Sequence, residues 1–179
     1  MAARVDSLLM TVEQFDALPE RQDALEELHW GLLVTLPRPK AWHVKLQMKL
    51  TQLLQPAAAE RGYVVMELPF RVVAQYDLRA ANVAFISKSR WDEVNDGYLF
   101  GPPELVIEII SPSNTKTQLR EYTALCLANG CEEFWAVDHK DGTVTVTRKN
   151  GQSVRYSTGM DVPIELLGGT AISVDQIFS

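Results

Sequence analysis

The sequence has few cysteines and no long hydrophobic run. Its two cysteines, Cys126 and Cys131, are five residues apart, a spacing that matches neither a CxxC redox motif nor a set of zinc ligands. We therefore expect both to be reduced thiols, with Cys126 packed in the core. No segment approaches the roughly 18 apolar residues of a membrane span, and residues 1–10 lack the apolar stretch of a signal peptide. These absences predict a cytoplasmic protein with no membrane partner.

Basic residues are also fewer than acidic ones. Lys and Arg total 17 against 23 Asp and Glu, which gives a net charge of −6. A chain with this balance repels a polyanion, so any contact with nucleic acid needs a local basic patch. One group of basic residues surrounds the start of a predicted helix, where an ordinary solvated helix face is the favoured interpretation. The group consists of Arg38, Lys40, Lys45 and Lys49.

The composition is that of one globular domain. The chain has 179 residues, 46% of them hydrophobic and 22% charged, which is enough apolar material for a core and too little charge excess for disorder. No repeat, low-complexity tract or linker interrupts it. We therefore expect a single domain over residues 1–179, with its core over about 10–178.

Hydrophobic periodicity predicts alternating helices and strands. Helices are expected at residues 12–18, 42–61, 117–129 and 173–178, and strands at 63–68, 70–75, 82–87, 104–110 and 133–138. Residues 26–36 fit two short strands or a tight hairpin around Gly31. Turn signals at 141–142 and 150–151 predict a hairpin over 143–156. The predicted fold class is α+β, with a central mixed sheet, flanking helices and a hairpin extension.

One carboxylate stands out in this pattern. Glu108 interrupts the run of residues 105–110, which is otherwise apolar on both faces and so typical of a central strand. An unpaired carboxylate in such surroundings is costly. A metal-related role is favoured, and a buried ion pair or a hydrogen-bonded structural glutamate is the alternative.

Several segments together carry a family resemblance. They lie at residues 10–15, 27–31, 43, 82–85, 103–113, 119–121, 129–130 and 133–138. The most specific are Glu108 in its apolar strand, the Ser-Pro-Ser at 111–113, and Gly130 followed by Glu-Phe-Trp-x-Val-Asp at 133–138. In order and spacing the chain resembles the Uma family, part of the PD-(D/E)XK restriction-endonuclease-like group. The resemblance extends from about residue 10 to 178 and implies a restriction-endonuclease-like core of α/β/α type.

The resemblance also implies a chemistry and a set of site residues. In that group an aspartate and a glutamate hold Mg²⁺ for phosphodiester hydrolysis, and a lysine polarises the attacking water. Glu108 matches the glutamate. Asn82 stands at the aspartate position, and Tyr122 stands at the lysine position, which in Uma-like chains lies on the following helix. Three further polar or acidic family positions are also changed, and they are occupied here by Gln118, Trp30 and Leu32.

These departures weaken the predicted metal chemistry. Asn82 offers an amide oxygen but no charge, which makes it a weak ligand beside Glu108 for Mg²⁺ or Mn²⁺. A unit charge a few Å from a divalent ion contributes on the order of several kcal/mol even at an effective dielectric constant of about 20. Tyr122 cannot replace the lysine charge, so its expected role is packing. The resemblance thus predicts a degenerate centre.

Four more residues are candidates for the same site. Glu27 is either a third carboxylate near Glu108 or part of a surface ion pair, and His43 is either a base or a solvated or capping residue. Glu104 is a carboxylate at the strand entrance, with an exposed charge as the alternative. Lys116 is the nearest lysine that could replace the missing one, although loop lysines are usually solvated.

Two functions of different classes remain open. The first is a divalent-metal-dependent DNA endonuclease with an altered centre formed by Asn82, Glu108, Glu27 and His43. The second is an inactive nuclease-like domain that binds a partner or oligomerises through residues 143–156 or the apolar region 30–36. We expect a homodimer, and DNA is a possible partner of the first.

Overall fold

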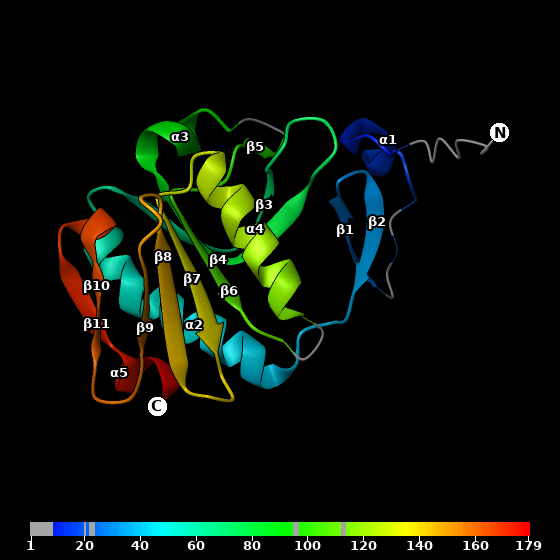
Figure 1. Cartoon of the computed structure of the whole chain (residues 1–179). Helices are drawn as coiled ribbons and strands as arrows, with labels where there is room; N and C mark the ends of the chain where they lie inside the picture. Colours follow the sequence, from blue (N-terminus) through cyan, green and yellow to red (C-terminus); the bar gives the residue numbers. More distant parts are fainter. Residues whose placement is uncertain (1–8, 20, 22–23, 95–96, 112–113) are drawn as a thin grey trace.

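A seven-stranded mixed β-sheet organises the chain (Figure 1). The computed structural model describes residues 9–19, 21, 24–94, 97–111 and 114–179. In spatial order the strands are β5 (Leu99–Phe100), β3 (Gly62–Arg71), β4 (Arg79–Ser87), β6 (Leu105–Ile109), β7 (Glu133–Asp138), β8 (Thr143–Arg148) and β9 (Ser153–Tyr156). The α+β class with a central mixed sheet is therefore confirmed.

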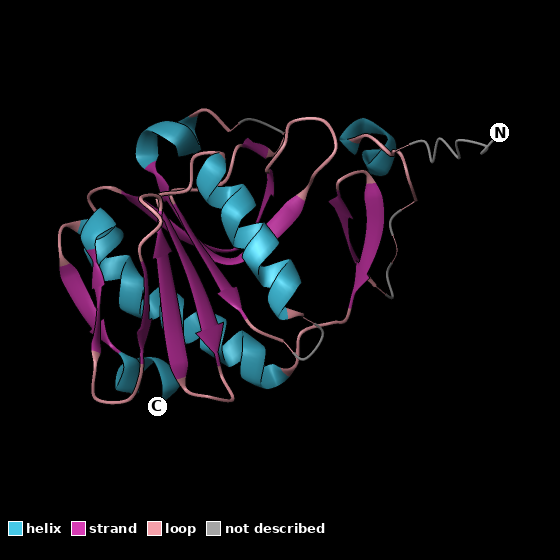
Figure 2. Ribbon diagram, in the orientation of Figure 1, coloured by secondary structure: helices cyan, strands magenta, loops and turns pink. Residues whose placement is uncertain are grey.

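The centre of the sheet is a parallel pair, β6 and β7, joined by helix α4 (Lys116–Ala128). β6 also pairs with β4, so it has a neighbour on each side, as its apolar sequence predicts. Helix α4 covers one face of the sheet and helix α2 (Ala41–Ala58) covers the other (Figure 2). Glu108 consequently lies on a strand that is sandwiched between two helices.

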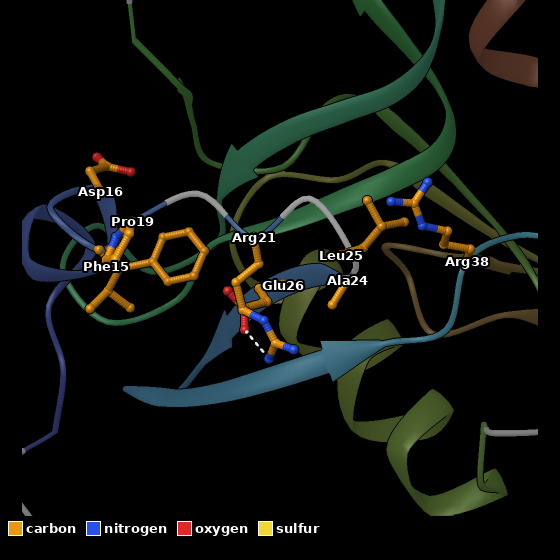
Figure 3. A pocket seen from close by; sticks show the side chains of 9 residues that line it. Phe15, Asp16, Pro19, Arg21, Ala24, Leu25, Glu26 and Arg38 are labelled. Atoms are coloured by element: carbon orange, nitrogen blue, oxygen red, sulfur yellow. Dashed lines mark hydrogen bonds and ion pairs between the residues drawn. The ribbon is translucent and has the colours of Figure 1, made fainter.

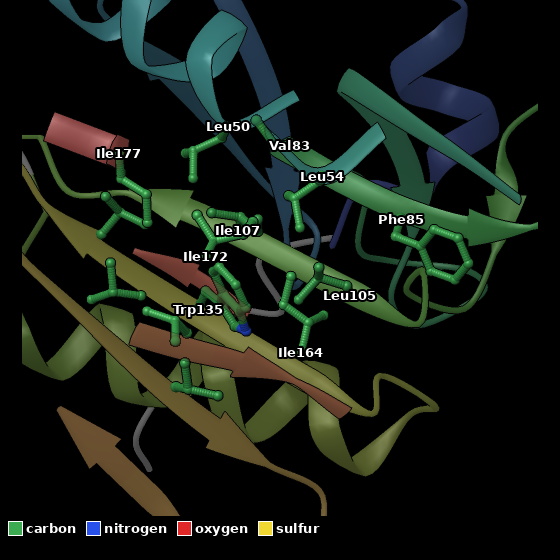
Figure 4. Packing of buried hydrophobic residues seen from close by; sticks show 14 of the residues in the cluster. Leu50, Leu54, Val83, Phe85, Leu105, Ile107, Trp135, Ile164, Ile172 and Ile177 are labelled. Carbon is green, nitrogen blue, oxygen red and sulfur yellow. The ribbon is translucent and has the colours of Figure 1, made fainter. Parts of the chain in front are cut away.

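The larger core fills the face beneath α2 (Figure 4). Leu50 and Leu54 of α2 pack with Ile107 of β6 and Trp135 of β7, all of which are fully buried. A second hairpin, β10 (Asp161–Ile164) and β11 (Thr170–Ser173), and helix α5 (Val174–Phe178) complete this layer. A 3₁₀ turn (Glu165–Leu167) joins the two strands. The hairpin has no counterpart among the predicted strands.

The smaller core lies beneath α4. Tyr122 and Cys126 of α4 pack against Val106 and Phe134, and Cys131 lies in the same cluster. Thr115 and Gln118 form a capping box at the start of α4, where the side chain of each accepts from the backbone N–H of the other. This bond pair explains the presence of Gln118 without a site role.

The hairpin of β1 (Leu25–His29) and β2 (Leu32–Leu36) is a separate two-stranded sheet. Its two turn residues, Trp30 (φ 52°) and Gly31 (φ 75°), both have positive φ, as a type I′ hairpin turn requires. Two backbone hydrogen bonds of 2.9 and 2.8 Å join Leu28 to Leu78, just before β4. These bonds hold β1 next to the start of β4 in the main sheet. Helix α1 (Val12–Asp16) packs on the same end through Val12.

Several predicted boundaries were wrong. The strands expected at 63–68 and 70–75 form one strand, β3, because a single register with β4 continues through Pro69. The helix expected at 42–61 ends at Ala58, and it accommodates Pro56 in its last turn. Helix α3 (Lys88–Asp92) and strand β5 were not predicted. None of the described helices is long and apolar enough to cross a membrane.

The predicted hairpin over residues 143–156 exists but does not stand apart from the sheet. β8 pairs with β7 on one side and with β9 on the other, so it is an interior strand. Its buried side chains, among them Val144 and Val146, belong to the larger core. Of the two hairpin strands, only β9 has a free edge that could pair with a partner, which reduces the contact surface that the sequence suggested.

Both cysteines should resist thiol reagents in the folded protein. Cys126 and Cys131 are free and fully buried. Burial raises the pKa of Cys126 well above its usual range and that of Cys131 to about 12, so the reactive thiolate is suppressed. We expect no reaction with Ellman's reagent at pH 8, and reaction of both thiols in guanidinium chloride. A rapid reaction of either thiol without denaturant would contradict this packing.

Candidate functional site

Three glutamates from three strands interact at one end of the sheet. Glu27 lies on β1, Glu67 on β3 and Glu108 on β6, and we call them the glutamate cluster. Both Glu27 and Glu67 raise the pKa of Glu108 through charge repulsion, which shows that the three are close. Glu67 was not identified from the sequence, where it is one polar residue in a predicted strand.

Glu108 is the most perturbed member of the cluster. Its neighbours on β6 are buried, and its own side chain is only partly exposed. Burial is the largest cause that raises the pKa of Glu108 well above its usual range, followed by repulsion from Glu27 and Glu67. The positive charge of Arg79 acts in the opposite direction. On balance, the surroundings of Glu108 favour its neutral form.

Glu27 is held by bonds to both of its oxygens. Oε1 accepts a 2.9 Å hydrogen bond from the backbone N–H of Ala80 on β4, and Oε2 lies 2.6 Å from Nε2 of His29. The side chain is 15% exposed. It thus ties the β1–β2 hairpin to the sheet, and its pairing with His29 is only partly exposed to solvent.

Glu67 is positioned by helix α2. Its backbone has a positive φ of 52°, and its Oε1 accepts a hydrogen bond from Nε2 of Gln47. The same Nε2 donates to the backbone oxygen of Asn82 over 3.1 Å. Burial raises the pKa of Glu67, and Gln47 lowers it. The one-turn spacing of His43 and Gln47 on α2 is a signal in the sequence that predicts this polar face.

His43 is buried rather than solvated or capping. It is 8% exposed, and its Nδ1 has no hydrogen-bond partner among the described residues. The N-cap position of α2 is Lys40, so His43 does not cap the helix. Its positive form lowers the pKa of Glu67, which places its ring near the cluster. The expectation of a solvent-exposed or capping residue was therefore wrong.

The amide oxygen of Asn82 accepts a hydrogen bond from the backbone. Its Oδ1 accepts a 2.8 Å hydrogen bond from the N–H of Ile109. The backbone pairs of β4 and β6 run from Phe85 with Leu105 to Val83 with Ile107. The side chain of Asn82 therefore extends the contact between the two strands beyond their last backbone pair. The amide oxygen that would have to coordinate a metal thus has a structural partner.

Tyr122 lies between a cation and a second aromatic ring. The guanidinium of Arg79 stands 4.7 Å from its ring centre, and the ring of Phe134 meets it edge-on at 5.3 Å. Its hydroxyl is buried and has no hydrogen-bond partner among the described residues. Burial raises the pKa of Tyr122 well above its usual range. Packing, as predicted, is its evident role.

Arg79 and Asp77 complete the site, and sequence reasoning missed both. Nε and Nη2 of Arg79 donate to the two carboxylate oxygens of Asp77 over 2.8 and 2.9 Å. Asp77 is fully buried and also accepts a 3.1 Å bond from the N–H of Trp30. Their i, i+2 spacing puts them on one side of an extended chain, but nothing in the sequence indicates that this side faces Glu108.

In this arrangement the residues do not form a ligand set for a divalent cation. No group of three His, Cys, Asp or Glu side chains among the described residues is placed to hold a metal ion. Glu27 has both oxygens engaged, and the amide oxygen of Asn82 bonds to the backbone. A divalent ion would therefore meet ligands that already have partners.

The remaining sequence candidates lie outside the cluster. Glu104 accepts from Ser87 and pairs with Arg90 at 3.3 Å, so it is a structural carboxylate. Lys116 is an exposed first residue of α4. Trp30 and Leu32 are exposed on the hairpin, at 52% and 59%. Residues 112–113 of the Ser-Pro-Ser motif lie outside the described residues.

A pocket of about 420 Å³ lies beside β1 (Figure 3). Phe15 and Leu25 give it apolar walls, and Arg21 and Glu26 form an ion pair of 3.3 Å within it. None of the five predicted site residues is among its described lining. It therefore adds no chemistry to the candidate site.

The buried hydroxyl of Tyr122 generates a stability prediction. Replacing Tyr122 with Phe removes an unsatisfied polar group and keeps the ring, so the free energy of unfolding should rise by about 1 kcal/mol. Urea denaturation measures the change. Tyr98→Phe is the matched control, because the Tyr98 hydroxyl donates to Asp16 over 2.6 Å and its loss should cost about 1 kcal/mol. A destabilised Tyr122→Phe variant would show that this hydroxyl has a bonding partner after all.

Comparison with known proteins identifies the fold and the family. The chain resembles in fold a crystal structure of a "putative nuclease belonging to DUF820" from Anabaena variabilis ATCC 29413. The TM-score is 0.80 at 21% identity, over 94% of this chain and 97% of that one. No curated protein matches the chain. The Uma2 family model, described as "Putative restriction endonuclease", matches residues 12–175, and the chain therefore belongs to the Uma2 family of restriction-endonuclease-like proteins.

Proposed function

We propose that this chain is a restriction-endonuclease-like protein in which metal-dependent phosphodiester hydrolysis is weakened or lost. The observation that carries the proposal is the 2.8 Å bond from the N–H of Ile109 to Oδ1 of Asn82. At the family's aspartate position the side chain has no charge, and its oxygen already serves the sheet. Glu108 is left as the one charged residue at the two acidic motif positions.

The energetic argument rests on charge. A carboxylate in place of Asn82 would add on the order of several kcal/mol of attraction for a divalent ion at an effective dielectric constant near 20. The lysine position holds Tyr122, whose buried ring supplies neither a proton nor a positive charge near neutral pH. The missing carboxylate at position 82 and the missing lysine at position 122 both lower the rate of hydrolysis, so reduced activity is the expected result.

DNA remains the substrate class that family membership favours. Arg38, Lys40, Lys45 and Lys49 surround the start of α2, the helix that also carries His43. A phosphate backbone bound at the start of α2 would approach the glutamate cluster. Binding through these residues should be weak because the net charge of the chain is −6. It should also depend strongly on salt, because contacts of Lys and Arg with phosphates release counterions.

Wild-type protein should nick supercoiled plasmid no faster than its Glu108→Ala variant in millimolar Mg²⁺ or Mn²⁺. The reason is that the metal ligands are incomplete without a charge at position 82. Nicking rates and thermal melts with and without the metal check this expectation, since a ligand that binds the native state must raise Tm. A wild-type rate about a hundredfold above that of Glu108→Ala would overturn the proposal, because that ratio represents close to 3 kcal/mol of barrier reduction.

The cause can be tested separately with Asn82→Asp. The new carboxylate keeps an oxygen for the Ile109 N–H and adds one negative charge, so Mn²⁺ should raise Tm more than in wild type. Asn150→Asp is the control, because Asn150 lies in the exposed turn between β8 and β9. Equal metal responses of the two variants would remove the charge at position 82 as the explanation.

A second function is favoured by the surface of the β1–β2 hairpin. Leu25, Trp30, Leu32 and Leu33 expose between 44% and 59% of their surface on this small sheet. Exposed apolar side chains gathered on one element are typical of interaction sites. We propose that, if hydrolysis is lost, the domain acts as a binding or oligomerisation module that forms a homodimer through this hairpin.

Substitution on the hairpin should then change the oligomeric state. Leu32→Gln removes the most exposed leucine of the hairpin and should convert a dimer to a monomer in sedimentation velocity experiments. Met48→Gln is the matched control, since Met48 is 48% exposed on α2. A dimer that survives Leu32→Gln, or a wild-type monomer, would argue against this surface as a dimer interface.

A further inference from the structure

Two aromatic rings from distant parts of the chain stack on each other at the surface. Trp42 is the second residue of α2, and His139 lies in the turn between β7 and β8. Their ring centres are 4.7 Å apart, and the ring planes are inclined by 11°. Figure 1 shows this turn beside the start of α2. Nearly parallel stacking is also the geometry in which a nucleobase packs on an aromatic side chain.

One ring of this stack is anchored and the other is open. Trp42 is partly buried against the larger core, and it meets the ring of His43 edge-on at 5.5 Å. His139 is exposed, and its ring forms no hydrogen bond with a described residue. Since Trp42 covers one face of the His139 ring, a planar ligand can reach the face that is turned away from Trp42. The two rings therefore form a flat platform on a rigid base.

The turn holds His139 in place without using its side chain. Oδ1 of Asp138 accepts hydrogen bonds of 2.9 and 3.2 Å from the backbone N–H groups of Lys140 and Asp141. This arrangement is typical of an aspartate at the start of a turn. The strands that flank the turn stay paired up to Asp138 and Thr143. A platform that is ordered before binding loses little conformational entropy when a ligand stacks on it.

Lysines without an acidic partner flank the platform. Lys140 follows His139 in the turn, and Lys40 is the N-cap residue of α2. Lys45 lies three residues after Trp42, on the same side of the helix. All three lysines are exposed, and none forms an ion pair with a described residue. Their charges are therefore available to a ligand on the platform.

The acidic residues of the turn are already engaged. Asp141 pairs with Arg155 at 3.0 Å, and Asp138 is half-buried with Oδ1 bonded to the backbone. The first turn of α2 contains no acidic residue. The surface around the platform thus has a local excess of positive charge, although the net charge of the chain is −6. Contact with a polyanion requires a local patch of this kind.

We propose that Trp42 and His139 form a stacking site for an unpaired base of single-stranded DNA, with Lys40, Lys45 and Lys140 on the flanking phosphates. The inference rests on the proposed DNA contact at the start of α2 and names the form of DNA that this surface selects. Stacking needs an open base face, which a base inside a duplex does not offer because its neighbours cover both faces. The site requires neither a metal ion nor hydrolysis.

The test is fluorescence anisotropy at low salt with labelled oligothymidylate and with an abasic strand of the same length. The abasic strand keeps the phosphates and lacks the bases, so the ratio of the two dissociation constants measures stacking. The central variant is His139→Ala, because the side chain of His139 takes no part in the hydrogen bonds of the turn. Asn150→Ala, in the exposed turn between β8 and β9, is the matched control.

Wild type and Asn150→Ala should bind oligothymidylate at least about fivefold more tightly than the abasic strand, which is the lower end of the effect of one base on an aromatic ring. His139→Ala should bind the two strands equally, with no change in its affinity for duplex. His139→Trp offers a larger ring and should increase the preference. Lys140→Gln should weaken binding of both strands equally and reduce the slope of log K against log salt by about 0.7.

Equal affinity of wild type for the two strands would overturn the stacking site but leave the DNA contact at α2 in place. A preference that survives in His139→Ala would also overturn it, since the base would then stack elsewhere. If His139→Ala does not fold, His139→Trp decides, and an unchanged or smaller preference there contradicts the site.

The failure of the inference can be told apart from the failure of the proposed function. If neither the single strands nor the duplex bind at low salt, the inference fails together with the proposed DNA contact. The plasmid assay on wild type decides the loss of hydrolysis separately, because it needs no substitution at His139.

Discussion

The carboxylate of Glu108 lies on the central strand of a sheet that is covered by a helix on each face, and the free-energy cost of burying its charge constrains everything around it. Repulsion from Glu27 and Glu67 adds to that cost. A cluster of this kind is stable only if the carboxylates take up protons or if a cation lies among them. Burial and the two neighbouring carboxylates outweigh the attraction of Arg79, so the surroundings of Glu108 favour its neutral form.

The position of Arg79 depends on a part of the chain that is distant in sequence. Arg79 is held by Asp77, and Asp77 is held by the N–H of Trp30 in the turn of the β1–β2 hairpin. Glu27 fastens the same hairpin to Ala80. The two-stranded hairpin would be marginal by itself. Its docking on the sheet and the positions of Glu27 and Arg79 are therefore parts of one network, and disruption of either should weaken the other.

The sequence predicts the central sheet and most helices because their signals are local. The apolar run around Glu108, the glycine after α4 and the capping boxes each determine structure within a few residues. The family resemblance adds the positions of Asn82 and Tyr122, which no local signal would identify. Arg79 and Glu67 were not predicted because their roles arise from contacts between elements that are distant in the sequence. The spacing of His43 and Gln47 marks a polar face on α2 but does not indicate that Glu67 lies against it. The same holds for β10 and β11, two four-residue strands whose few apolar side chains belong to the larger core.

The substitutions at the centre follow a common physical logic. An aspartate at position 82 would have added a fourth negative charge beside Glu27, Glu67 and Glu108, and without a bound metal its repulsion would destabilise the fold. An asparagine removes that charge and keeps the bond to Ile109 that joins β4 to β6. A lysine at position 122 would lie next to Arg79, where two cations repel, whereas a tyrosine ring attracts the guanidinium. Asn82 and Tyr122 are thus consistent with the presence of Arg79, and both residues make the site more stable without a metal ion and less suited to hold one.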